Sequence, residues 1–135
     1  MPPRRRVAVD EGRRALAVCR SAGFAADRDV TATAVRYTLE ELGTIAPGRT
    51  VEVRVPPHGA AQCIEGPVHR RGTPPNVIET DAATWLALVV GDLSWHDAVA
   101  SGQVRASGQR AHLDGLLPLL PWPPPTAADG RARDE

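Results

Sequence analysis

The sequence predicts an α+β domain: a single, mostly antiparallel sheet of about five strands with helices packed on one face. Two observations indicate this. Helical spacing places Val35, Leu39 and Leu42 on one side of a segment, whereas apolar and polar residues alternate strictly over residues 49–55. At 135 residues the chain can bury one core. We expect one domain over residues 9–121, between Pro-rich and charged disordered tails at 1–8 and 122–135.

Two helices are expected before the first strand. Residues Val9–Ser21 have an apolar side and end near Gly23. The second helix carries Leu39 and is expected to end at Gly43. Its candidate N-caps are Asp29, Thr31 and Thr33.

Four strands can be placed from alternation. The first covers residues 49–55, and the turn at Pro56 to Gly59 leads into a partner strand at 60–65, with Gln62 and Ile64 on one face. Asn76–Thr80 and residues 103–107 are the third and fourth. We expect a short fifth strand around residues 68–71.

Helices fill the rest of the C-terminal half. Thr80 or Asp81 can cap a helix that Gly91 ends, and Ser94 can cap a second, short helix at Trp95–Ala100. The Leu-rich residues 113–120 then predict a helix that Pro118 breaks into two parts.

The order of these elements resembles the sterol-carrier-protein fold. The resemblance lies in ASGQVRASGQRAHL followed by LLPLL, and residues 46–81 resemble more narrowly the bacterial orthologue branch, found as stand-alone actinobacterial proteins. Together these stretches cover residues 30–121. The resemblance implies a cavity between sheet and helices that holds a hydrophobic small molecule of lipid, fatty acyl or polyprenyl type.

The candidate cavity lining is an apolar set in the C-terminal half. It comprises Trp85, Leu86, Val89, Leu93, Val99, Leu113, Leu116, Leu117 and Leu120. An ordinary packed core would show the same periodicity, so this alternative stays open. The polar residues expected at the cavity mouth are His69, Arg70, Arg71 and Asn76. Their alternative role is to fix the shape of the loop.

A second polar group offers chemistry, but the structural interpretation is favoured. His58, Glu65, His69 and Glu79 accompany Cys63, and a nearby imidazole can hold a thiol as thiolate. Cys63 lies in an alternating strand, however, where a free cysteine is usually a small buried hydrophobe. We predict no catalytic residue and no metal site, because the histidine spacing completes no ligand set. His96 and His112 are expected to face solvent from helices.

Composition narrows the function classes. Basic and acidic residues balance at 16 each, so charge does not predict a nucleic-acid partner. No apolar run reaches the ~20 residues of a membrane span, and two distant cysteines favour the reducing cytoplasm. We expect a non-enzymatic carrier without cofactors. The alternative is an accessory or protein-interaction domain, including a partner of mycothiol-type enzymes, and a homodimer is left open.

Overall fold

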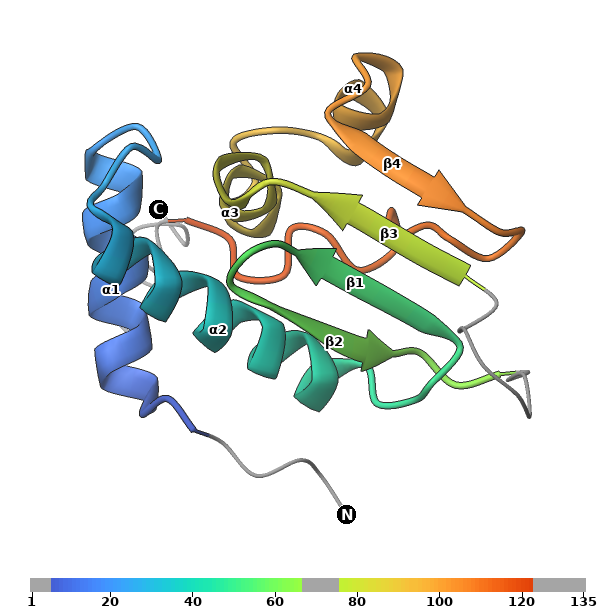
Figure 1. The fold of residues 1–135 in the computed structure, drawn as a ribbon, viewed down its shortest axis with the longest axis horizontal. Coiled ribbons are helices and arrows are strands. Elements are labelled where there is room, and N and C mark those ends of the chain that lie inside the picture. The colour runs from blue at the N-terminus through green and yellow to red at the C-terminus, as the bar shows by residue number, and fades with distance from the viewer. Residues whose placement is uncertain (1–5, 67–75, 123–135) are drawn as a thin grey trace, which may run out of the picture.

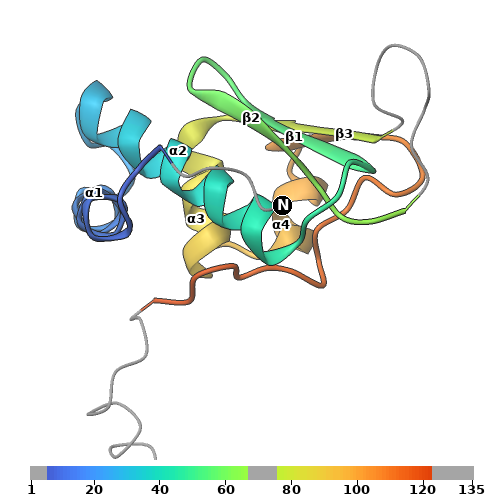
Figure 2. The same cartoon turned by 90° about the horizontal axis from the view of Figure 1, so that it is seen from below.

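The computed structural model describes residues 6–66 and 76–122, and shows one four-stranded sheet with helices on one face (Figures 1 and 2). The strands are β1 (Val51–Val55), β2 (Gly59–Cys63), β3 (Asn76–Thr80) and β4 (Val104–Ser107). The helices are α1 (Val9–Ser21), α2 (Arg28–Ile45), α3 (Ala82–Val90) and α4 (Trp95–Ala100). The predicted α+β class is confirmed. The expected fifth strand falls outside the described residues.

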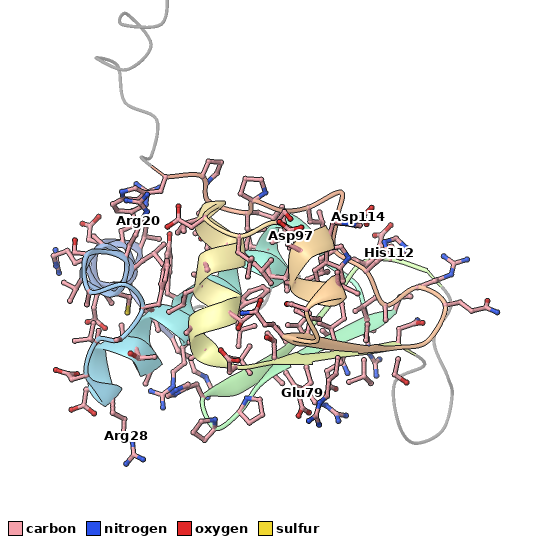
Figure 3. The ribbon with its side chains drawn as sticks, turned by 90° about the horizontal axis from the view of Figure 1, so that it is seen from above. Arg20, Arg28, Glu79, Asp97, His112 and Asp114 are labelled. Carbon is pink, nitrogen blue, oxygen red and sulfur yellow. The ribbon has the colours of Figure 1, made fainter. Side chains whose placement is uncertain are left out.

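The sheet order is β2-β1-β3-β4. β1 pairs antiparallel with β2 and β3 antiparallel with β4, whereas the central β1 and β3 run parallel. Alternation puts Val51, Val53 and Val55 on the helix side, where all three are fully buried. The opposite face carries charge, and Glu79 points away from the helices there (Figure 3).

The helices form the second layer. α2, α3 and α4 lie under the sheet, and α1 lies beside α2 (Figure 2). Gly12 of α1 allows this close approach, because a Cβ there would come within 2.1 Å of the Tyr37 ring on α2. Within the helix layer, a buried hydrogen bond of 2.8 Å from Trp85 Nε1 of α3 to Thr38 Oγ1 joins α3 to α2.

Helix caps confirm most of the predicted boundaries. Asp81 accepts a hydrogen bond from the Thr84 amide and Ser94 from the Asp97 amide, while Gly91 ends α3 at a φ of 90°. The predicted cap of α2 was wrong. Asp27 is the cap, and α2 continues through Gly43 to Ile45.

Two further predictions were wrong. The partner strand predicted at residues 60–65 ends at Cys63, because Ile64 adopts a φ of 68° that leaves the extended region. Residues 113–120 contain no helix. They form a turn closed by the Leu117 amide on the Leu113 carbonyl, and the amides of Leu120 and Trp122 then bond to Val89 and Val90 at the end of α3.

Candidate functional site

The predicted cavity lining is divided between core and surface. Trp85, Leu86, Val89 and Leu113 are at most 1% exposed. Leu93, Leu116, Leu117 and Leu120 are half-buried at the edge of the core, and Val99 is 42% exposed on α4. These nine residues therefore do not line one common space.

An apolar hollow nevertheless brings two of them together. It is a shallow depression, open to solvent, with a volume of about 600 Å³, and it lies between the end of α2 and the C-terminal segment, residues 111–122. Its lining includes Ile64, Leu113 and Leu116, with Pro47 at one side and Glu65 and His112 as polar neighbours. This depression therefore combines open space with a lining of mainly apolar residues.

The C-terminal segment covers part of this region with few hydrogen bonds. Its Leu120 amide donates to the Val89 carbonyl at 2.9 Å and its Trp122 amide to the Val90 carbonyl at 3.1 Å. Arg20 of α1 lies 5.8 Å from the centroid of the Trp122 ring and pairs with Asp92 through two hydrogen bonds of 3.1 and 3.2 Å. The segment is thus held by hydrogen bonds at its far end and by the buried side chains of Leu113 and Leu119.

The predicted mouth residues are only partly accounted for. His69, Arg70 and Arg71 lie outside the described residues. Asn76 is 4% exposed and connects two segments: its Nδ2 donates to the Thr50 carbonyl at 2.9 Å, and its Oδ1 accepts from the Arg110 amide at 2.8 Å. Both ends of its amide are occupied by backbone, so the structure gives Asn76 an architectural role.

The described members of the Cys63 group do not meet as a catalytic set. Cys63 is fully buried on the helix side of the sheet, and burial raises the pKa of its thiol to about 11. His58 lies in the β1–β2 turn, Glu65 borders the apolar hollow, and Glu79 lies on the opposite face of the sheet. A thiol with that pKa is a poor nucleophile at neutral pH.

His96 and His112 face solvent, as expected, although His112 lies in an irregular segment and not in a helix. Its Nδ1 is 2.9 Å from Asp114 Oδ1, and the two side chains lie together at the beginning of the C-terminal segment (Figure 3). Within residues 6–66 and 76–122 no three His, Cys, Asp or Glu side chains converge as a metal site would require. None of the helices in the same ranges is both long and apolar enough to cross a bilayer.

A second, larger depression was not anticipated from the sequence. This groove between α2 and β2 has a volume of about 1120 Å³ and is open to solvent. Its walls carry Arg36 and Leu39 from α2 and the small residues at 59–61 from β2. The small residues Gly-Ala-Ala at the beginning of β2 leave this space beside the strand. They indicate a groove only once it is known that α2 packs against β2.

A family model described as the bacterial SCP ortholog matches residues 27–119, well over half of the chain. This range contains all four strands and helices α2, α3 and α4. It also contains every residue that lines the apolar hollow. A comparison with curated proteins gives no match. The chain therefore belongs to the bacterial sterol-carrier-protein ortholog family.

Proposed function

We propose that this protein binds and carries a hydrophobic small molecule, of lipid, fatty acyl or polyprenyl type, without catalysing a reaction on it. The observation that supports the proposal is the apolar hollow between the end of α2 and the C-terminal segment. Its volume of about 600 Å³ falls within the range of roughly 300–1,000 Å³ found for small-molecule sites. Membership of the family agrees with a carrier role.

The lining favours a flexible apolar chain over a polar ligand. Ile64, Leu113 and Leu116 supply branched aliphatic surface, and the polar neighbours Glu65 and His112 are both exposed at the rim. Each methylene that leaves water for such a surface gains about 0.8 kcal/mol. Affinity should therefore rise about fourfold per methylene until the hollow is filled.

The C-terminal segment is proposed to act as a lid. It contains no helix and makes two backbone hydrogen bonds to the last carbonyls of α3, at Val89 and Val90. Leu117 and Leu120 belong to the segment and are half-buried, so displacing it would move both side chains off the core and extend the hollow toward α3. Three of the five predicted lining residues outside the segment, the buried Trp85, Leu86 and Val89 of α3, would then form the floor of the enlarged site.

Displacement of a fluorescent fatty acid tests the proposal. Leu116→Glu places a charge in the hollow and should weaken binding at least about tenfold. Val18→Glu is the matched control, because Val18 is an apolar residue 51% exposed on α1, away from the hollow. Equal binding by both variants and the parent protein would refute the site.

Leu117→Glu tests the lid separately. Leu117 does not line the hollow as it stands, so a loss of uptake with an unchanged circular dichroism spectrum supports movement of the segment. Unchanged uptake would exclude the lid and leave the hollow.

The second candidate is an accessory role in the cytoplasm beside a partner enzyme, such as a thiol-dependent one. Both cysteines of the chain are free and buried, so a partner or cofactor would have to supply the reacting thiol. Capture of a defined enzyme by the tagged protein, with a change in that enzyme's rate, would favour this role.

A further inference from the structure

Two segments from outside the family range meet at the end of α3. The family match covers residues 27–119, so α1 and Trp122 lie beyond its two ends. Arg20 of α1 donates two hydrogen bonds to the Asp92 carboxylate, of 3.1 and 3.2 Å, and lies over the Trp122 ring at 5.8 Å from its centroid (Figure 3). A single side chain therefore connects α1, the end of α3 and the end of the C-terminal segment.

The charges at this junction complement each other. Asp92 follows Gly91 directly after α3, and the unpaired carbonyl groups at a helix C-terminus make a carboxylate unfavourable there. Arg20 lies in the last turn of α1, where the same dipole favours a cation. The ion pair thus offsets the unfavourable position of Asp92. Its two hydrogen bonds also restrict the guanidinium group that lies over the Trp122 ring.

The last residues of the C-terminal segment are attached next to this junction. The amides of Leu120 and Trp122 bond to the last two carbonyls of α3, and the Leu119 side chain between them is buried. Pro118 packs against Gly91, where a Cβ would lie 3.2 Å from the Pro118 Cβ. Both hydrogen bonds lie within two residues of the Trp122 ring, so a contact that holds this ring also holds the part of the segment that covers α3.

We propose that Arg20, Asp92 and Trp122 form a latch that keeps residues 117–122 closed on α3 and sets the rate at which a ligand enters and leaves. The inference rests on the proposed carrier function and concerns its regulation: α1, a helix outside the family range, controls access to the hollow. The Arg20 and Asp92 side chains are each 36% exposed, so dissolved ions screen their attraction. High ionic strength should therefore open the latch.

Stopped-flow fluorescence of the full chain with cis-parinaric acid measures uptake and release. Arg20→Gln should make both rates about 3- to 10-fold faster, because it removes the ion pair and the contact with the Trp122 ring. The equilibrium affinity should change by less than about twofold, because the latch closes the empty and the filled protein alike. Arg14→Gln is the matched control, the same substitution at an exposed position of α1. Trp122→Leu keeps the ion pair, removes the ring and should also raise both rates.

Amide hydrogen exchange tests the latch without a ligand. Exchange at the Leu120 and Trp122 amides should be about 3- to 10-fold faster in Arg20→Gln than in the parent protein. The amides of β1 should be unchanged, which excludes a general loss of the fold. High NaCl should speed exchange at Leu120 and Trp122 in the parent protein and in Arg14→Gln, but not in Arg20→Gln.

The outcomes separate the latch from the carrier function. Unchanged exchange at Leu120 and Trp122 in Arg20→Gln would overturn the latch. Faster exchange with unchanged rates of uptake and release would overturn its control of access. Absence of uptake by the parent protein would overturn the carrier function and the control of access with it, whereas the exchange measurement would still decide whether Arg20 holds the segment closed.

Discussion

Replacing Asn76 with Ala removes a connection between three parts of the fold. The side-chain amide joins the Thr50 carbonyl before β1 to the Arg110 amide after β4, and it does so from the first residue of β3. The substitution deletes two hydrogen bonds, of 2.9 and 2.8 Å, at a residue only 4% exposed. Because two backbone groups lose their partner at a buried position, we expect a loss of about 2–4 kcal/mol in the free energy of unfolding.

Urea denaturation followed by circular dichroism measures this loss. Ser107→Ala is the control, because Ser107 is an exposed polar residue at the end of the neighbouring strand and should change stability by less than about 0.5 kcal/mol. On heating, the Asn76 variant should unfold about 10 °C lower than the parent. A loss no greater than that of the control would refute the assignment of Asn76 as a structural connector.

Two further predictions concern the backbone and the thiols. Gly48→Ala should lower the free energy of unfolding, measured by thermal denaturation, by at least about 2 kcal/mol, because φ is +149° and a Cβ would lie 2.0 Å from the Ile64 carbonyl oxygen. Gly23→Ala is the control: it has open space at φ +63° and should lower stability by about 1 kcal/mol. Equal losses in the two variants would contradict this prediction. Cys19 and Cys63 should both react slowly with a thiol reagent at pH 8 in the native protein and rapidly in denaturant, because burial raises both pKa values. Burial raises the pKa of Cys63 from 9.0 to about 11, so the contribution of the neutral thiol to stability is complete below pH 9 and is lost as the pH rises through 11. Denaturation of the parent protein and of Cys63→Ala at several alkaline pH values measures this loss. An equal decline of stability with pH in both proteins would contradict the prediction.

Local sequence signals predicted the elements whose boundaries depend on neighbouring residues. The helix Val9–Ser21, the strand Asn76–Thr80 and the short helix Trp95–Ala100 have the expected bounds. Gly23 follows the first helix, and the Ser94 cap and Gly102 flank the short one; these signals act within a few residues, so the sequence carries the information directly. The N-cap of α2 was misassigned because Thr31 and Thr33 use their hydroxyls differently. They donate to the carbonyls of Ala26 and Asp29.

Tertiary contacts decided the features that were not predicted. The leucines of residues 113–120 favour a helix locally, but Pro118 lacks an amide hydrogen and the amides of Leu120 and Trp122 bond to α3 instead. The left-handed turn at Ile64 accompanies the close approach of Gly48 to its carbonyl, a contact between distant residues. The parallel pairing of β1 with β3 likewise depends on the whole fold.

The candidate sites follow the same division. Periodicity identified Leu113 and Leu116 as apolar and inward, but it could not separate residues that fill the core, such as Trp85, from residues that border a hollow. The groove between α2 and β2 exists only because α2 packs against that strand, which no local pattern indicates.

Native mass spectrometry of the protein purified without detergent tests the carrier function most directly. A carrier should show an added mass of a few hundred daltons that denaturation releases, or that appears after incubation with a lipid extract. Leu116→Glu should fail to retain this mass. A bare protein mass under both conditions, with the fold intact, would contradict the proposed carrier function.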